Sequence, residues 1–159
     1  MNKLLILLFI CVNTIIYSQE KKVLKIYSFA EVEKLHKVTP KPIVVFIYTD
    51  WCNICHGMDK NTFTDNKVIT LLNKSFYFIK LDGEEKKDIT FLGKKFVYKP
   101  SGVNTGSHEL AIELATIRKR VSYPTTTILD NNFTIAIQLK GFRNKKEMKS
   151  ILTRASKKY

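Results

Sequence analysis

The sequence predicts an α/β fold, a sheet covered by helices, and two features support that prediction. Residues 43–48 form an unbroken apolar run, rich in β-branched and aromatic side chains, which is typical of a strand buried on both faces. Expected strands and helices alternate from residue 22 to residue 81, an order that builds parallel strands. With 159 residues and 45% apolar content, the chain is long enough for one domain with its own core.

The first half of the chain contains the expected elements in the following order. Residues 22–27 are expected to form a short strand, and Ser28 with Glu31 matches a capping box that begins a helix running to about His36. Two prolines, Pro40 and Pro42, end that helix before the buried strand. The remaining expectations are a helix from Asn53 through Met58, a break over 62–65, a helical stripe from Val68 and a strand over 75–81.

The second half begins with a long stretch before the next core strand. We expect a β-hairpin over 89–98 with its turn at Gly93, a loop over 100–106, and a helix capped by Ser107. Residues 125–129 and 134–139 read as two strands joined by a turn-rich connection. Asn144 is the expected N-cap of a final helix, whose core face holds Met148, Ile151, Leu152 and Ala155.

The chain is strongly basic, with 27 Lys and Arg against 14 Asp and Glu and a formal charge of +13. These residues are scattered and accompany no recognition motif, which argues against nucleic-acid binding and favours a lysine-rich solvated surface. Affinity for acidic partners or an anionic membrane surface is the alternative.

Residues 1–18 resemble a signal peptide. Lys3 supplies a positive start, residues 4–16 are a short apolar stretch, and Ser18 is a small residue before the expected cut. The stretch is too short for a comfortable membrane-spanning helix, although an uncleaved anchor is the alternative. Cys11 would be discarded with this peptide. We therefore expect an exported, periplasmic protein, with a domain over 19–159 and no stable membrane insertion after cleavage.

The remaining cysteines, Cys52 and Cys55, directly follow the buried strand. A bridge across two intervening residues closes so small a loop that it adds little stability, so the pair is expected to be chemical rather than structural. At the first turn of the expected helix, unpaired N–H groups and the helix dipole would favour the thiolate of Cys52. Cys55 lies one turn along and can close on it.

Two motifs in this order resemble the thioredoxin-fold family. Trp51-Cys52-Asn53-Ile54-Cys55 is similar to its active site, and Ser122-Tyr123-Pro124-Thr125 is similar to its cis-proline loop. The segment 62–65, Thr-Phe-Thr-Asp, is similar to exported bacterial thioredoxin-like thiol–disulfide oxidoreductases. The resemblance covers roughly residues 28–159. It implies a three-layer α/β/α sandwich with a mixed sheet, and an inserted β-hairpin and helix over about residues 83–121, before the cis-proline loop.

The resemblance also implies roles for the site residues. Cys52 would be the nucleophile and Cys55 the resolving thiol, exchanging disulfides with protein substrates in the reductive direction. Docking and site shape would come from Trp51, Asn53, Ile54, His56, Tyr123 and a cis Pro124. The resemblance implies no metal and no cofactor. It does imply a membrane electron donor or acceptor as a partner, and a monomeric protein. One position departs from the family pattern, because Phe46 stands where thioredoxins carry a buried aspartate.

Three other interpretations of the cysteines remain open. Cys52-Asn-Ile-Cys55-His56 also matches the attachment motif of c-type haem, which would require His56 as one axial ligand and Met148 or His108 as the other. Zinc binding lacks a fourth ligand at the usual spacing. A redox-silent binding module would keep the fold without a reversible cysteine couple.

Overall fold

The computed structural model describes residues 22–159 and contains a mixed four-stranded sheet at its centre. The expected signal peptide and Cys11 lie outside the described residues. The strand order is β10-β9-β1-β2, with bounds Ile135–Lys140, Thr125–Leu129, Ile43–Tyr48 and Tyr77–Asp82. β1 runs parallel to β2 and antiparallel to β9, so the chain builds the predicted mixed sheet.

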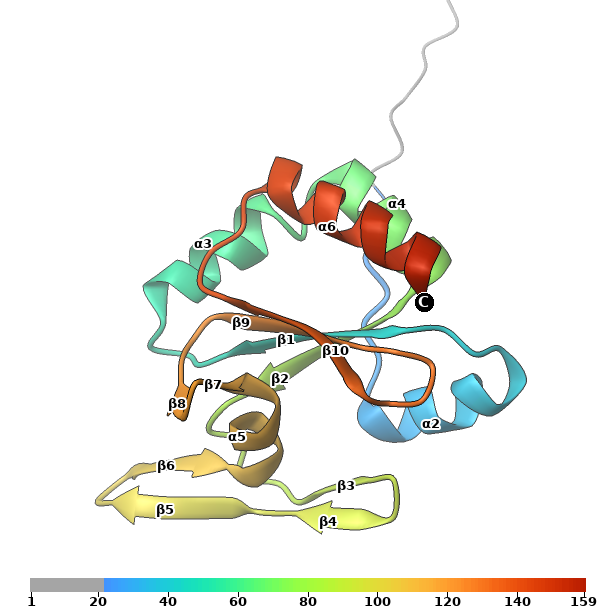
Figure 1. Ribbon diagram of the computed structural model, residues 1–159. Helices are drawn as coiled ribbons and strands as arrows, with labels where there is room; N and C mark the ends of the chain where they lie inside the picture. The colour runs from blue at the N-terminus through green and yellow to red at the C-terminus, as the bar shows by residue number, and fades with distance from the viewer. Residues whose placement is uncertain (1–21) are drawn as a thin grey trace, which may run out of the picture.

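Helices cover both faces of this sheet and complete the predicted three-layer sandwich (Figure 1). On one face lie α3 (Asn53–Asn61), α4 (Asn66–Ser75) and α6 (Lys145–Lys158). The other face is covered by α2 (Phe29–Val38) and α5 (Glu109–Ala115). The capping boxes at Ser28 and Asn144 are both formed, as the sequence predicts.

The central strand β1 supplies both cores because successive side chains point to opposite faces. Val44 and Phe46 enter the core under α3, α4 and α6, whereas Ile43, Val45 and Ile47 enter the core under α2 and α5. All five side chains are buried, as the unbroken apolar run predicts. The sheet is therefore fixed from both sides at the strand that leads into the cysteines.

The predicted strand over 22–27 is wrong. This segment makes one backbone hydrogen bond to the sheet, from Tyr27 N to Phe78 O at 2.9 Å. The side chain of Asn73 on α4 takes two further bonds, accepting from Lys25 N and donating to Val23 O. An amide side chain thus replaces the neighbouring strand, and β2 is the edge of the sheet.

The segment before the Tyr123-Pro124 loop contains more strands than predicted. The expected hairpin exists as β3 (Ile89–Phe91) and β4 (Lys94–Phe96), with its turn at Leu92 and Gly93. The expected loop over 100–106 is wrong, since β5 (Tyr98–Gly102) and β6 (Thr105–His108) form a second hairpin. Asn104, at φ +56°, supplies the left-handed residue that its turn requires.

Two further differences concern α5 and the residues after it. His108, not Ser107, is the N-cap, because its Nδ1 accepts from Leu110 N at 3.3 Å. A third hairpin, β7 (Thr116–Ile117) with β8 (Arg120–Val121), was not predicted. Its turn uses Arg118 and Lys119 at positive φ, where side chains are uncommon, so no glycine or asparagine marks it.

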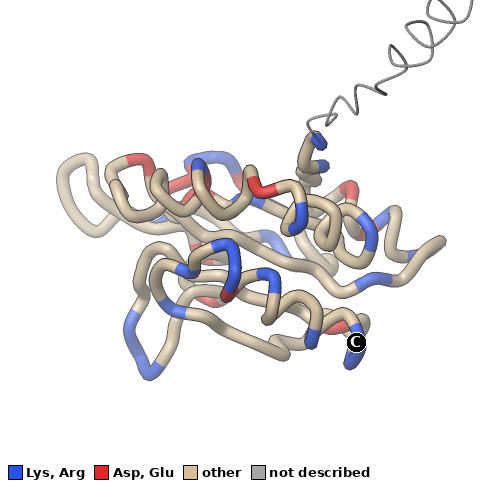
Figure 2. Tube along the Cα trace, turned by 90° about the horizontal axis from the view of Figure 1, so that it is seen from above, with Lys and Arg blue, Asp and Glu red and all other residues tan. Residues whose placement is uncertain are grey.

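The basic residues are not concentrated on one element. Lys and Arg are spread over the helices and loops of the molecule (Figure 2). Within residues 22–159, no helix combines the length and apolar character needed to cross a bilayer.

Candidate functional site

The site is built around a disulfide at the start of α3. Cys52 is the N-cap of this helix, and its sulfur accepts a hydrogen bond from Cys55 N at 3.2 Å. The two cysteines are joined, with their Cα atoms 5.2 Å apart. Cys52 keeps 7% of its surface exposed and Cys55 only 1%. Cys52 therefore lies directly before the first turn of α3, where the sequence analysis placed it within that turn, and it is the more exposed of the two cysteines.

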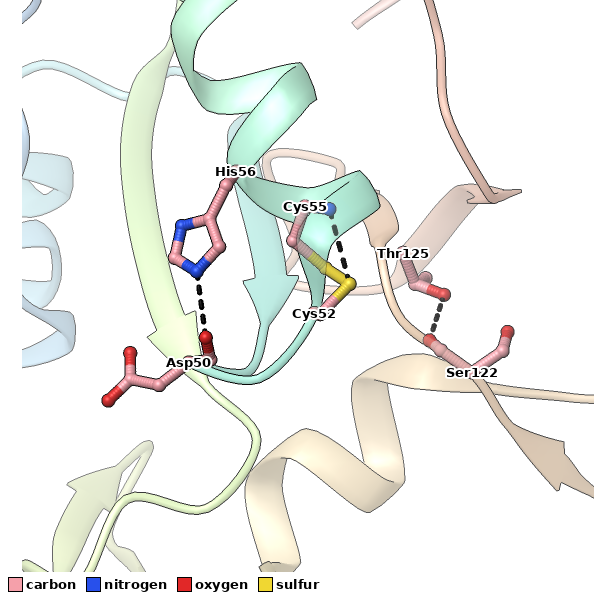
Figure 3. Close-up of a disulfide and its surroundings, with 6 residues drawn as sticks. All are labelled: Asp50, Cys52, Cys55, His56, Ser122 and Thr125. Carbon is pink, nitrogen blue, oxygen red and sulfur yellow. Dashed lines mark hydrogen bonds between the residues drawn. A yellow bond between two sulfur atoms is a disulfide. The ribbon is translucent and has the colours of Figure 1, made fainter.

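The loop between β1 and α3 is fixed by local hydrogen bonds (Figure 3). Cys52 N donates to Thr49 O at 3.1 Å, which turns the chain out of the sheet. The ring of His56 is 2.7 Å from Asp50 O through Nε2, and because a carbonyl only accepts, Nε2 is the donor. His56 thus ties the first turn of α3 to the residue two before Cys52.

Trp51 and Ile54 form an exposed apolar rim beside the disulfide. The indole of Trp51 is 64% exposed and Ile54 is 59% exposed, while Asn53 between the cysteines is also exposed. Trp51 is not free, because its Nε1 donates to Glu84 Oε1 at 3.1 Å and its ring meets Tyr123 edge-on with centroids 6.0 Å apart. This rim is an exposed apolar surface beside the disulfide.

The second motif lies on the other side of the disulfide, where Figure 3 shows Ser122 and Thr125. The Tyr123–Pro124 peptide bond is cis, and Pro124 is buried. Pro124 O accepts from Gly141 N at 2.8 Å, and Thr125 Oγ1 donates to Ser122 O at 2.7 Å. The chain thus brings two segments about seventy residues apart to the same sulfur pair.

Tyr123 packs against Gly83, at the end of β2. A Cβ on Gly83 would lie 2.4 Å from the Tyr123 ring, so any side chain at this position would have to displace the ring. Burial raises the pKa of Tyr123, an effect that the neighbouring Ser107 hydroxyl partly offsets and the charges of Glu84 and Asp82 increase. Tyr123 is consequently a neutral phenol at physiological pH.

Beneath the disulfide the core is aromatic. Phe46 stacks on Tyr48 with centroids 5.8 Å apart and meets Phe63 edge-on at 4.8 Å, so no carboxylate occupies this position. An ion pair lies near it, where Lys80, which pairs with Phe46 in the sheet register, contacts Asp59 at 2.8 Å. Asp59 lies one helical turn after Cys55 on α3.

The sequence did not single out the residues contributed by the end of β2. Asp82 is opposite Tyr48 in the parallel register, so Gly83 and Glu84 come beside the residues that follow β1. The carboxyl ends of neighbouring parallel strands meet at one edge of a sheet. The expected strands over 43–48 and 75–81 are parallel neighbours, so the sequence could have indicated that Asp82, Gly83 and Glu84 lie close to the residues that follow residue 48.

The residues required for haem attachment do not fit that group here. Met148 is fully buried in the core, and His108 is fully buried as the cap of α5, whereas His56 is exposed. Among residues 22–159, no three His, Cys, Asp or Glu side chains are grouped to hold a metal ion.

Comparisons with known proteins agree with this geometry. The family model described as "Thioredox_DsbH: Protein of unknown function, DUF255" matches residues 19–138, most of the chain. A segment of 62 residues is 37% identical to an uncharacterized protein of Caenorhabditis elegans. That match covers 39% of this chain and 8% of the relative, so the chain spans a small part of that protein's length.

Solved structures show the fold. The DsbH oxidoreductase is similar with a TM-score of 0.62 and 17% identity, over 88% of this chain and 89% of its own. A thioredoxin from Thermus thermophilus has a TM-score of 0.59 and 19% identity, covering 84% of this chain and 87% of its own. The reduced DsbD C-terminal domain of Neisseria meningitidis has a TM-score of 0.54 and 16% identity, covering 79% of this chain and 91% of its own.

The matched region contains the buried strand, the disulfide at the helix N-terminus and the Tyr123-Pro124 loop, and family membership supports disulfide exchange over haem attachment. The chain belongs to the Thioredox_DsbH family of thioredoxin-like thiol–disulfide oxidoreductases, with Cys52 and Cys55 as its CxxC pair.

Proposed function

We propose that this protein is an exported reductase of protein disulfides, with Cys52 as the nucleophile and Cys55 as the resolving thiol. The observation that carries the proposal is the position of Cys52 at the N-terminus of α3. Its sulfur already accepts the Cys55 N–H, and a helix N-terminus stabilises a thiolate more than a thiol. Cys52 is also the more exposed of the two.

The exchange takes place in two displacement steps. The Cys52 thiolate attacks one sulfur of a partner disulfide, forms a mixed disulfide, and releases the other partner sulfur as a thiolate. The Cys55 thiolate then attacks the Cys52 sulfur, which closes the intramolecular disulfide and releases the first partner sulfur. Two electrons and two protons pass to the partner. A second dithiol protein, which we place in the membrane, restores the reduced pair.

The residues around the pair would position the partner. Trp51 and Ile54 supply the exposed apolar rim, while Asn53 and His56 complete the first turn of α3. Tyr123 and Pro124 shape the opposite side, where the backbone of an incoming peptide would lie against the Ser122–Thr125 segment (Figure 3). The signal-like residues 1–18 support export to the periplasm, and we propose that the protein acts there as a monomer.

Single-cysteine variants of the purified protein test the assignment. Cys55→Ser should accumulate a mixed disulfide with substrate protein through Cys52, detected as added mass on a non-reducing gel and by mass spectrometry. Cys52→Ser should form none, because the remaining thiol is buried. Equal trapping by the two variants would contradict the assigned roles.

Equilibration of the wild type with glutathione, followed by thiol trapping, tests the direction. A couple near about −270 mV fits a reductase, whereas one near about −120 mV would make the protein a disulfide donor. A pair that cannot be reduced and reoxidised reversibly would leave only a binding role.

A further inference from the structure

Four acidic residues lie where β1 and β2 end. Asp50 follows β1, Asp82 ends β2, and Glu84 with Glu85 follows β2. Burial raises the pKa of Asp82, and the charges of Asp50, Glu84 and Glu85 raise it further, against a hydrogen bond from Glu84 N. These side chains therefore share one negative field, in a chain whose formal charge is +13.

None of these four carboxylates forms an ion pair with a lysine or arginine among residues 22–159. The ion pairs of residues 22–159 use other acids, namely Asp59, Asp88, Glu109 and Glu113. Nearby lysines are directed elsewhere: Lys80 contacts Asp59 at 2.8 Å, and Lys86 lies 3.4 Å over the Tyr98 ring. Lys87, which lines the groove described next, forms no ion pair among residues 22–159.

A groove of about 340 Å³ lies next to these carboxylates. It is lined by residues 27–30 before and within α2, residues 79–82 of β2, and residues 85 and 87–90 of the following loop. Its lining includes the apolar residues Phe29, Leu81 and Ile89 and five charged residues, Lys80, Asp82, Glu85, Lys87 and Asp88. Lys80 and Asp88 are in ion pairs with residues outside the lining, which leaves Asp82 and Glu85 against Lys87, so the groove is partly apolar and net acidic.

The open edge of β2 lines this groove. The bond from Tyr27 N to Phe78 O is the last that the N-terminal segment makes to β2, because α2 begins at Phe29 and leads the chain away. Alternate residues of a strand direct their backbone groups to the same side, so those of Lys80 and Asp82 also point outward. Lys80 N–H, Lys80 C=O and Asp82 N–H have no backbone partner among residues 22–159. Such an edge can pair with an extended peptide.

We propose that this groove docks an extended segment of the partner protein that carries lysine or arginine side chains. Docking there selects the disulfides that Cys52 and Cys55 exchange. The segment pairs with the edge of β2 at Lys80 and Asp82, and its cations neutralise the carboxylates at the ends of β1 and β2. This inference rests on the proposed function. Charge complementarity decides the chemistry of the occupant, since the carboxylates at the ends of β1 and β2 form no ion pair among residues 22–159.

Paired peptide substrates test the inference with the full-length protein, reduced beforehand. Two disulfide-bridged peptides differ only in having three lysines or three glutamates near the bridge. The wild type should reduce the basic peptide about tenfold faster at low salt, and the ratio should fall toward one as salt screens the charges. The double variant Asp82→Asn, Glu85→Gln should lower the ratio to near one, because both amides keep an acceptor oxygen but lose the charge.

A charge-matched control separates the groove from net charge. Glu33→Gln with Glu113→Gln makes the same change of charge on α2 and α5, outside the groove lining, and should keep the wild-type ratio. A ratio near one in the wild type, or an equal fall in both double variants, would overturn the inference. Reduction of a small neutral disulfide by the wild type keeps the two proposals apart. Its absence would refute the oxidoreductase role itself.

Hydrogen exchange locates the docked segment. A basic peptide with serine in place of cysteine should slow exchange of the Lys80 and Asp82 amides. Protection confined to the Ser122–Thr125 segment would overturn docking on β2. Sedimentation of the free protein tests the other occupant: a dimer that is lost in the Asp82→Asn, Glu85→Gln variant would show that a second copy fills the groove and would also overturn the inference.

Discussion

The two faces of the sheet are built for different tasks. The face under α3, α4 and α6 holds the disulfide in an aromatic and aliphatic core, with Phe46, Phe63 and Phe78 in mutual contact. The opposite face has a core of its own, under α2 and α5, and carries all the hairpins of the segment between β2 and β9. The first face therefore holds the disulfide, and the second carries the hairpins inserted between β2 and β9.

Tyr123 joins the two faces. Its ring packs against both hydrophobic cores, meets Trp51 and covers Gly83. Substitutions in the hairpins can therefore change one face while the disulfide site on the other face stays the same. Tyr123 is the contact between the two faces. Substitutions on each face and at this contact should separate the two tasks.

The largest effect is expected for Phe46→Ala on the disulfide face. Removing this fully buried ring should lower the free energy of unfolding by about 3–5 kcal/mol. It should also change the redox equilibrium with glutathione, because Phe46 shares a core with both cysteines. Urea denaturation and thiol trapping would measure the two effects.

The matched substitution is Leu110→Ala in the core under α5. It should cost about 2–5 kcal/mol and leave the redox equilibrium as in the wild type. If both substitutions moved the redox equilibrium equally, the two faces would not be separable.

An intermediate effect is expected where the faces meet. Gly83→Ala would place a methyl group 2.4 Å from the Tyr123 ring, so the ring must shift, at a cost of about 1–3 kcal/mol. Its control is Gly57→Ala inside α3, where the new methyl group meets open space and helix propensity should add about 0.5–1 kcal/mol. Thermal unfolding would compare them, and a stabilising Gly83→Ala would contradict the close packing of Tyr123.

The smallest effect concerns pH and Asp82. Burial and neighbouring carboxylates raise its folded-state pKa above the ordinary value of 3.8, so its contribution to stability is lost as pH rises through the folded value. Asp82→Asn should therefore be slightly more stable than the wild type at neutral pH, and the difference should vanish below about pH 4.

Glu31→Gln on α2 should change stability at neutral pH in the opposite direction to Asp82→Asn. The Ser28 backbone and hydroxyl hydrogen bonds lower the pKa of Glu31, so the carboxylate stabilises the fold at neutral pH and loses that effect as pH falls through its folded-state pKa. This variant should be less stable than the wild type at neutral pH. Urea midpoints across pH 3 to 8 would show whether the two variants diverge in opposite directions.

Much of the fold could be predicted because local and long-range signals agree at β1, α2 and α6. The apolar run over 43–48 and the caps at Ser28 and Asn144 all report what the structure contains. The pairing of Cys52 with Cys55 follows from their spacing on one helix.

The remainder depends on contacts that no local pattern reports. Residues 22–27 have the composition of a strand, but Asn73 on α4 binds their backbone in place of a neighbouring strand. The turn at Arg118 and Lys119 uses residues that rarely adopt positive φ. Glu84 joins the site only because β1 and β2 end side by side.

The position of Trp51 also determines how this protein can be observed. It is the only tryptophan of the chain, and its exposed indole stands directly before one sulfur of the disulfide. An excited indole gives up an electron more readily to a nearby disulfide than to two thiols, so its fluorescence should brighten when the pair is reduced. A partner that covers the indole would also shift the emission to shorter wavelength. The unlabelled protein therefore carries its own fluorescent probe. The intensity of the Trp51 emission reports whether the disulfide is reduced, and its wavelength reports whether a partner is bound.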